Sequence, residues 1–194
     1  MMICIVGKSG SGKSTISNIL KSYSDNIVIL EGDKISHQTL QIEEVKNEIR
    51  KNIKDVFDEL GNIDRKKLRK IVFNDKEKLD YINNLSWRYM EKMIDLYLLE
   101  NKNKIVILDW LLAIKTKYFE MSDIKIFVDS PFDVRLKRVI ERDNISYEDF
   151  IKREAAAPII DKDRFDIVID NIEINESKRK VEKIYDKSII HRKF

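Results

Sequence analysis

Nine residues near the start of the chain have the types and spacing of a loop that binds phosphate groups. The run from Gly7 to Thr15 reads GKSGSGKST, which fits the pattern G-x-x-x-x-G-K-[ST]. Glycines let the backbone form a concave surface lined with N–H groups, and Lys13 adds a compact positive charge for the β- and γ-phosphates. The Ser14 hydroxyl suits a Mg²⁺ ion that bridges those phosphates. We therefore expect a nucleoside triphosphate to bind at Gly10, Ser11, Gly12, Lys13, Ser14 and Thr15.

The segments around this loop are of the kinds that the motif needs. Residues 2–6 form a short apolar run typical of a buried strand, and residues 15–23 have the pattern of a helix. Helical segments separate further apolar runs, which predict four more strands at residues 26–30, 105–108, 124–128 and 165–169. Strands that alternate with helices predict an α/β fold with a parallel five-stranded sheet, right-handed crossovers and flanking helices.

Acidic residues follow each of these four strands, and the carboxyl edge of a parallel sheet is where ligands bind. They are Glu31 with Asp33, then Asp109, Asp129 and Asp170. A carboxylate at Asp33 can act as general base toward an attacking hydroxyl, or it can cap a helix that begins near Ser36. Asp109 can help to hold Mg²⁺ in the manner of a Walker B carboxylate, or it can be an ordinary turn residue.

Two long intervals between the expected strands lack a convincing strand of their own. Residues 36–103 read as several helices broken near Gly61, and we expect a helical lobe that binds the acceptor. Residues 131–164 carry several arginines, and a basic helical insertion at this place is typical of a lid that closes over phosphates. We expect these two insertions and a core of residues 1–35, 104–130 and 165–194 to form a single domain.

Two arginines of the expected lid are candidates for contact with a transferring phosphoryl group. Arg138 and Arg142 are four residues apart on a predicted helix and therefore share a face. Two guanidinium groups on one face suit the negative charge that spreads over a phosphoryl group during transfer. The alternative is surface pairing with nearby acidic residues, which are Glu141, Asp143 and Glu148.

The composition limits the classes of protein to which the chain can belong. The net charge of +3 arises from 37 basic and 34 acidic residues without a distinct basic face, so we expect no nucleic-acid partner. Cys4 is the only cysteine, which excludes an internal disulfide, and we expect it in the core. His37 and His191 are too far apart in the sequence to predict a zinc site. With no signal-peptide pattern and no run long enough to span a bilayer, we expect a cytoplasmic protein that does not bind membranes.

Five motifs together resemble the dephospho-coenzyme A kinase family, and the likeness extends over most of the chain. The most distinctive is residues 61–73, GNIDRKKLRKIVF, which is close to the family's Gly-x-hydrophobic-Asp/Asn-Arg-x-x-Leu-x-x-x-Val-Phe signature. The others are the loop at residues 10–15, Glu31-Gly32-Asp33 in place of an Asp-Ala-Asp-like segment, the lid with Arg138, Arg142 and residues 152–156, and IVIDN at residues 167–171. The resemblance implies a P-loop kinase that moves the γ-phosphoryl group of Mg·ATP to the ribose 3′-hydroxyl of dephospho-coenzyme A.

The resemblance also implies a role for individual residues. Lys13 and the loop amides would hold the ATP phosphates, and Asp33 would be the base for the 3′-hydroxyl. Arg142 would be a lid arginine on the transferring phosphate. Asn171 would lie near the adenine, and the helical lobe would hold dephospho-coenzyme A.

Three places differ from the family's usual pattern, mainly on the acceptor side. Asn84-Leu85 stands where a His-Pro pair is usual, residues 110–114 read WLLAI in place of Pro-Leu-Leu-Phe-Glu, and Ala157 stands where a Gln is usual. These differences leave two alternatives open. One is a kinase of the same architecture that acts on a nucleoside or (deoxy)nucleotide, and the other is a nucleotide-binding module without catalysis.

Overall fold

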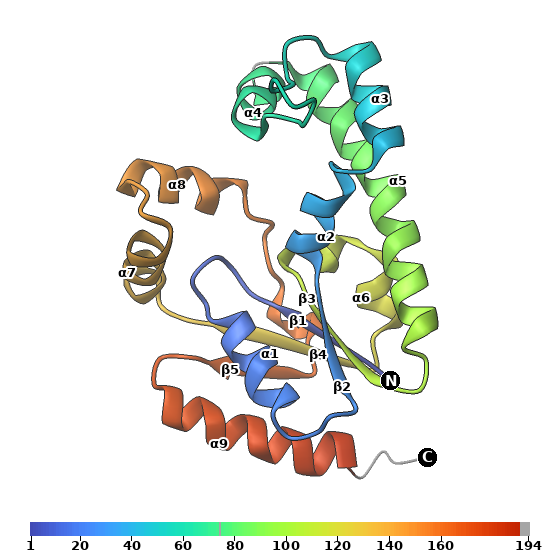
Figure 1. Ribbon diagram of the computed structural model, residues 1–194. Coiled ribbons are helices and arrows are strands. Elements are labelled where there is room, and N and C mark those ends of the chain that lie inside the picture. The colour runs from blue at the N-terminus through green and yellow to red at the C-terminus, as the bar shows by residue number, and fades with distance from the viewer. Residues whose placement is uncertain (74, 191–194) are drawn as a thin grey trace. The chain divides into compact units, whose positions relative to one another are not determined.

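A computed structural model describes residues 1–73 and 75–190 of the chain, and His191 lies outside these residues. The chain divides into two compact units (Figure 1). The first contains Met1–Gly32 and the chain from Asn101 onward, so it includes both the expected core and the expected lid. The second is Asp33–Glu100, which is close in extent to the helical lobe expected at residues 36–103.

The first unit is built on a parallel five-stranded sheet with the strand order β2-β3-β1-β4-β5, which confirms the expected α/β fold. The strands are β1 (Met2–Val6), β2 (Ile27–Glu31), β3 (Ile105–Asp109), β4 (Ile124–Asp129) and β5 (Ile167–Asp170). The acidic residues expected at the carboxyl ends of four strands are the last residues of β2, β3, β4 and β5. In the sheet, Glu31 lies opposite Asp109, and Asp129 lies opposite Asp170.

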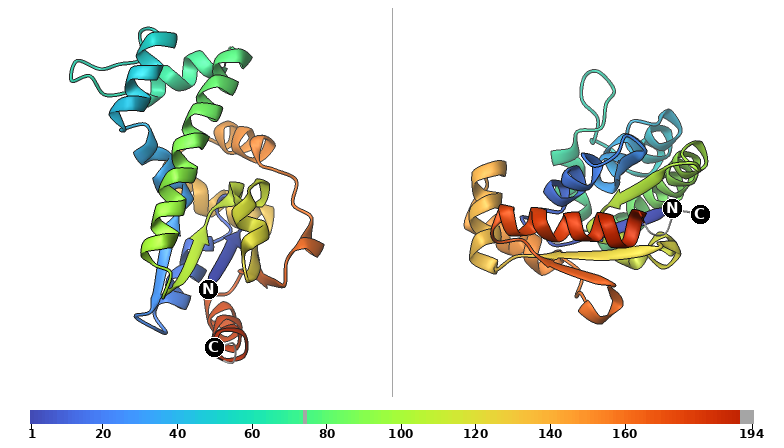
Figure 2. Two further views of the ribbon diagram at one scale, coloured as in Figure 1. Left: turned by 90° about the vertical axis from the view of Figure 1, so that its right-hand side faces the viewer. Right: turned by 90° about the horizontal axis from the view of Figure 1, so that it is seen from below.

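The helices of the first unit surround this sheet (Figures 1 and 2). They are α1 (Lys13–Lys21), η1 (Leu111–Lys115), α6 (Lys117–Met121), α7 (Phe132–Asp143), α8 (Tyr147–Ala156), η2 (Lys162–Arg164), α9 (Ile174–Ile184) and η3 (Tyr185–Ile190). The expected lid between β4 and β5 is therefore helical. Among the described residues, no helix combines the length and the apolar character needed to cross a bilayer.

The main core lies between the sheet and the neighbouring helices α1 and α9. Side chains alternate along β1, so Ile3 and Ile5 point into this core, where Ile16 and Leu20 of α1 meet them. Each fully buried aliphatic side chain of this size contributes about 1.5–3 kcal/mol relative to an exposed one. This packing fixes the start of α1 at the end of β1, with only the glycine-rich loop between them.

The second unit is helical, with α2 (Gly32–Thr39), α3 (Glu43–Asn52), α4 (Arg65–Phe73) and α5 (Lys76–Glu100). The expected break near Gly61 is a turn in which Gly61 has φ +76°, closed by an isolated bridge between Phe57 and Ile63. The helix expected to begin near Ser36 begins at Gly32, directly after β2. Asp33 therefore lies in the first helical turn and is not an N-cap, and a carboxylate in a first turn is favourable toward the helix dipole.

Cys4 should be inert toward thiol reagents while the protein is folded. It is fully buried in β1, and burial raises the pKa of its thiol to about 12, partly opposed by a hydrogen bond with Ser122. The reactive thiolate is therefore negligible at about pH 8. We expect a chromogenic disulfide reagent to label no thiol in the native protein and one per chain in concentrated guanidinium chloride. Rapid stoichiometric labelling without denaturant would contradict this placement of Cys4.

Candidate active site around the glycine-rich loop

Two glycines give the loop between β1 and α1 its shape. Gly10 has φ +80° and Gly12 has φ +90°, a backbone region that L side chains rarely adopt. A Cβ atom on Gly12 would lie 2.0 Å from the Asn171 Nδ2 atom, and one on Gly10 would lie 2.6 Å from the Arg135 carbonyl oxygen. Both positions therefore need glycine for conformation and for space. The dipole of α1, whose N-cap is Gly12, adds positive character to the loop.

Three consecutive carbonyl groups of the loop are bonded by side chains from outside it. Arg135 Nη1 donates to the Ser9 carbonyl oxygen at 3.4 Å, and Arg138 Nη1 donates to that of Gly10 at 3.3 Å. The Ser11 carbonyl oxygen accepts from Ser130 Oγ at 3.2 Å and from Asn171 Nδ2 at 2.8 Å. These bonds hold the loop in one conformation, so a bound anion would not have to order it.

Asn171 joins the loop to helix α9. It follows β5, is only 4% exposed, and accepts a hydrogen bond from the Ser177 hydroxyl of α9 at 2.8 Å through Oδ1. Its other amide atom bonds the loop, as described above. The role near an adenine that the resemblance implies stays a prediction, whereas the contact with the loop backbone is a second role that the sequence did not indicate.

Asp109 ends β3 beside the first turn of α1 and is 6% exposed. Its Oδ2 atom accepts a hydrogen bond from Ser17 Oγ at 3.1 Å, and the Ser14 hydroxyl also bonds the carboxylate. Burial raises the pKa of Asp109, and the positive charge of Lys13 and the two hydroxyls oppose that rise. A carboxylate and a hydroxyl from Asp109 and Ser14 are the hard oxygen donors that Mg²⁺ prefers, so this donor set fits the ion.

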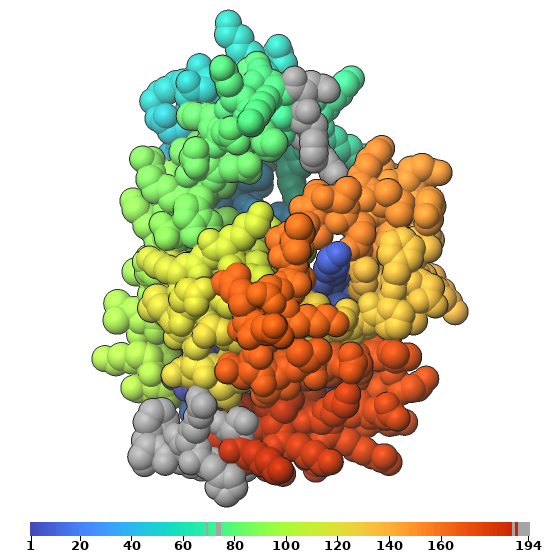
Figure 3. Space-filling model, turned by 180° about the vertical axis from the view of Figure 1, so that it is seen from behind, coloured from blue at the N-terminus to red at the C-terminus, as the bar shows by residue number. Residues whose placement is uncertain are grey.

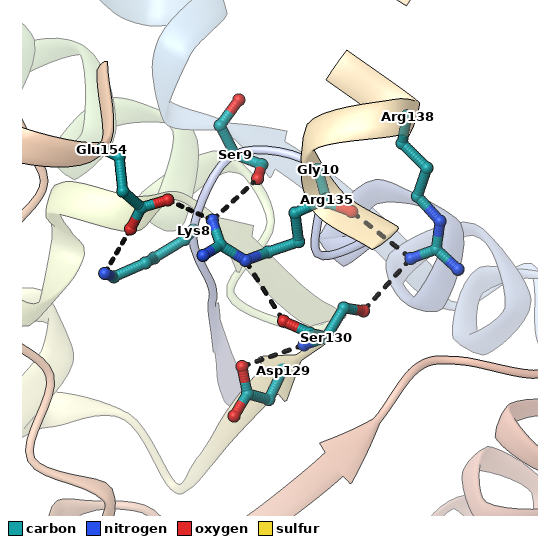
Figure 4. A network of polar contacts seen from close by, with 8 residues as sticks. All are labelled: Lys8, Ser9, Gly10, Asp129, Ser130, Arg135, Arg138 and Glu154. Carbon is teal, nitrogen blue, oxygen red and sulfur yellow. Dashed lines mark hydrogen bonds and ion pairs between the residues drawn. The ribbon is translucent and has the colours of Figure 1, made fainter. Parts of the chain in front are cut away.

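The arginines of α7 have different surroundings. Arg135 is buried, and its Nε also donates to the Ser130 carbonyl oxygen at 3.2 Å. Arg138 also bonds the Ser130 hydroxyl at 3.1 Å and the Ile172 carbonyl oxygen at 3.3 Å. These two arginines contact the loop, and Figure 4 shows their bonds to Ser9, Gly10 and Ser130.

Arg142, the third arginine along α7, has a side chain that is 63% exposed. It pairs with Asp143 through Nε–Oδ1 at 2.7 Å and Nη2–Oδ2 at 3.1 Å. Hydrogen bonds from Arg142 and Arg153 hold the pKa of Asp143 at about 2 against the opposing effect of partial burial. Pairing with Asp143 is one of the alternatives that the sequence left open, and a phosphate role for Arg142 stays a prediction.

Glu154 of α8 belongs to the lid motif at residues 152–156, but the sequence did not indicate its contacts with the loop. Its carboxylate binds both Lys8 of the loop and Arg135 of α7 (Figure 4). Burial acts to raise the pKa of Glu154, but the hydrogen bonds from Arg135 and Lys8 outweigh it and keep the pKa below its usual range. The charge is therefore negative at neutral pH. From behind, part of the blue N-terminal segment remains visible in a hollow beside the orange segment that contains α8 (Figure 3).

The proposed base, Asp33, belongs to the second unit, together with His37 and Arg65. Arg65 Nη2 lies 2.6 Å from His37 Nε2, which joins the start of α4 to α2. Burial and the charge of Arg65 lower the pKa of His37, and Asp33 acts in the opposite direction. His37 is therefore uncharged at neutral pH, and the general-base role of Asp33 stays a prediction.

Gly32 and Trp110 meet at the ends of β2 and β3. A Cβ atom on Gly32 would lie 2.2 Å from Trp110 Cγ, so the buried indole fills the space that an alanine would need. Gly32 stands where the family segment has Ala, and Trp110 stands where the family usually has Pro. Two departures from the family pattern therefore compensate each other in space.

Comparison with known proteins identifies relatives along the whole chain. The family model for dephospho-CoA kinase matches residues 1–176. A dephospho-CoA kinase of Aquifex aeolicus is 34% identical over 190 residues, which cover 95% of each chain. One of Fusobacterium nucleatum is 34% identical over 181 residues and covers 88% of this chain and 91% of the relative.

Solved structures agree with this result. A dephospho-CoA kinase from Campylobacter jejuni has a TM-score of 0.64 and 25% identity, with 95% of each chain covered. A crystal structure from Thermus thermophilus has a TM-score of 0.85 over 97% of each chain; at 23% identity it supports the fold alone. The phosphate loop, the sheet and the relatives together lead to one conclusion: this chain belongs to the dephospho-CoA kinase family.

Proposed function

We propose that this chain transfers the γ-phosphoryl group of ATP to the ribose 3′-hydroxyl of dephospho-CoA, the reaction for which its family is named. One observation carries the proposal: a chain of this family holds a glycine-rich loop whose consecutive carbonyl groups are bonded from outside by Arg135, Arg138 and Asn171. Such a loop is ready for a polyphosphate. We take the cytoplasm, the compartment expected from the sequence, as the place of the reaction.

The donor half of the reaction belongs to the loop and the start of α1. The loop N–H groups would bind the phosphates, and Lys13 would neutralise the charge that develops on the β- and γ-phosphates. Ser14 of α1 and Asp109 of β3 would hold Mg²⁺, and Thr15 follows Ser14 on α1. When bound, the ion supplies positive charge that stabilises the transferring phosphoryl group and the departing diphosphate.

The acceptor half is the task of the second unit in this proposal. Asp33 would orient the 3′-hydroxyl and accept its proton as the oxygen forms a bond to the γ-phosphorus. The bond between that phosphorus and the β,γ-bridging oxygen breaks, and ADP leaves with the electron pair. Arg138 and Arg142 of α7 would stabilise the charge on the phosphoryl group in transit, and Asn171 would lie near the adenine.

A panel of acceptors tests the proposal directly. Purified protein with Mg·ATP should phosphorylate dephospho-CoA, as measured by ADP release and by the mass of the product. Lys13→Ala should lower the rate by about two to three orders of magnitude, because it removes charge stabilisation at the phosphates. Lys21→Ala, an exposed lysine of the same helix, is the matched control. Phosphorylation of a nucleoside with none of dephospho-CoA would reject the proposed acceptor.

Asp33→Asn should separate chemistry from donor binding. Removing a general base typically lowers the rate of the chemical step about 10²–10⁴-fold. ATP affinity, measured by calorimetry without acceptor, should stay as in the wild type. Asp80→Asn, which changes an exposed acid of α5, serves as control. Weakened ATP binding with an unchanged single-turnover rate would assign Asp33 to another role.

Asp109→Asn should make the protein more stable and less active. The folded-state pKa of Asp109 is raised above its unfolded value, so the ionised carboxylate destabilises the fold at neutral pH. This penalty shrinks as the pH falls and the carboxylate is protonated. We expect a higher unfolding free energy at neutral pH and a higher Mg²⁺ requirement for turnover. Asp25→Asn, an exposed acid in the turn before β2, should change neither. An Mg²⁺ dependence equal to that of the wild type would exclude Asp109 from the metal site.

A further inference from the structure

Three charged side chains from three separate segments meet at the rim of the phosphate loop. Lys8 belongs to the loop, Arg135 to α7 and Glu154 to α8 (Figure 4). One carboxylate oxygen of Glu154 accepts from Lys8 Nζ and the other accepts from Arg135 Nη1. The Lys8 side chain is 33% exposed and that of Glu154 17%, so this anion is largely withdrawn from water.

The two cations are held in different ways. Arg135 has further bonds to the carbonyl oxygens of Ser9 and Ser130, and its guanidinium lies 5.9 Å from the ring centroids of Phe132 and Phe150. It therefore has contacts that keep it in place if the carboxylate leaves. Lys8 is a flexible and more exposed cation that can turn to another anion.

Helix α8 has attachments to α7 that do not involve Glu154. The Phe150 ring packs edge-to-face on Phe132 with centroids 5.4 Å apart, and Arg153 binds Asp143. The carboxylate of Glu154 can therefore leave its cations without releasing the helix from its neighbour. Its contacts at the rim are better explained by the charge of the loop than by the packing of the lid.

A carboxylate whose two oxygens each accept from a cation presents the chemistry of a phosphate group. It does so at the rim of a loop whose N–H groups and helix dipole favour anions. Resting on the proposed function, which puts the donor phosphates in this loop, a second anion at the same rim has two consequences. It occupies cations that phosphates would use, and it repels the incoming negative charge.

We propose that the Glu154 carboxylate competes with the nucleotide phosphates for Lys8 and Arg135. In this way it sets the affinity of the donor site and its preference among nucleotides that carry different numbers of phosphate groups. A nucleotide with more phosphate groups gains more from displacing the carboxylate. Displacement also frees the C-terminal end of α8 from the loop, so nucleotide binding and the position of this lid helix are linked.

Glu154→Gln tests the proposal, because it keeps the size of the side chain and removes its charge. Calorimetric titration should show ATP binding about fivefold tighter than in the wild type, equivalent to about 1 kcal/mol. The gain should be smaller for ADP and absent for adenosine, a dependence that a purely structural role would not produce. Glu148→Gln, an exposed acid of the same helix, should bind all three ligands as the wild type does.

A second pair of variants tests whether Lys8 is one of the cations for which Glu154 and the phosphates compete. In a Lys8→Met protein, Glu154→Gln should give a smaller gain in ATP affinity, because one of the two contested cations is gone. Should Glu154→Gln fold poorly by thermal unfolding, Glu154→Asp replaces it: one methylene shorter, it reaches the two cations less well, and we expect an intermediate gain.

The outcomes separate this proposal from the proposed function. If the wild type binds ATP and the charge-removing variant binds it equally or more weakly, Glu154 does not compete with phosphates and the inference is wrong. A gain of equal size for adenosine would also overturn it. If the wild type binds no adenine nucleotide at all, the donor site itself is misassigned.

Discussion

The site depends on the hydrogen bonds that hold the loop carbonyls from outside. A loop that presents N–H groups to an anion must turn its carbonyl oxygens elsewhere, and buried carbonyl groups need partners. Here Arg135, Arg138, Ser130 and Asn171 supply them. The residues that follow β4 and β5 and the first two turns of α7 therefore position the side chains that bond the loop. The same contacts require glycine at residues 10 and 12. A side chain at residue 10 would collide with Arg135, and one at residue 12 would collide with Asn171.

Charge at the site is balanced within a small volume. Arg135, Arg138, Lys8 and Lys13 lie in or against the loop, and the carboxylate of Glu154 pairs with Lys8 and Arg135. On the other side, Asp109 stays buried next to the first turn of α1 at some cost to stability. A buried acid with a raised pKa is typical of functional sites, where stability is reduced to keep a reactive or ligand-binding group in place.

The sequence predicted the sheet and the loop because both are local patterns. Each strand is a short apolar run, and the loop lies within nine residues, so neither needs knowledge of distant contacts. The sequence placed the start of α2 about four residues too late, because Asp33 is a residue type that favours an N-cap, whereas the helix begins at Gly32 and has Asp33 in its first turn. The arginines show the remaining difficulty. Arg135, Arg138 and Arg142 have spacings that all allow one helix face, and only the fold decides that Asp143 binds the last of them.

The sequence placed Glu154 in the lid motif at residues 152–156 but could not reveal its partners, for a similar reason. Its partner Lys8 is 146 residues away, and no spacing rule connects a loop after the first strand with a helix after the fourth. The general-base role of Asp33 and the phosphate role of Arg142 rest on the family resemblance and on chemistry. The positions of Asp33 and Arg142 in the structure neither support nor contradict these two roles.

The close approach of Gly32 and Trp110 restricts which side chains these two positions can hold together. An indole beside an alanine at residue 32 would put a methyl carbon 2.2 Å from the ring, which no small shift of packed backbone accommodates. A glycine at residue 32 beside a small side chain at residue 110 would leave only a gap, which reduces stability less than a steric clash does. Residue 32 can therefore only be glycine while the indole of Trp110 holds this position, so the two residues limit each other's replacement.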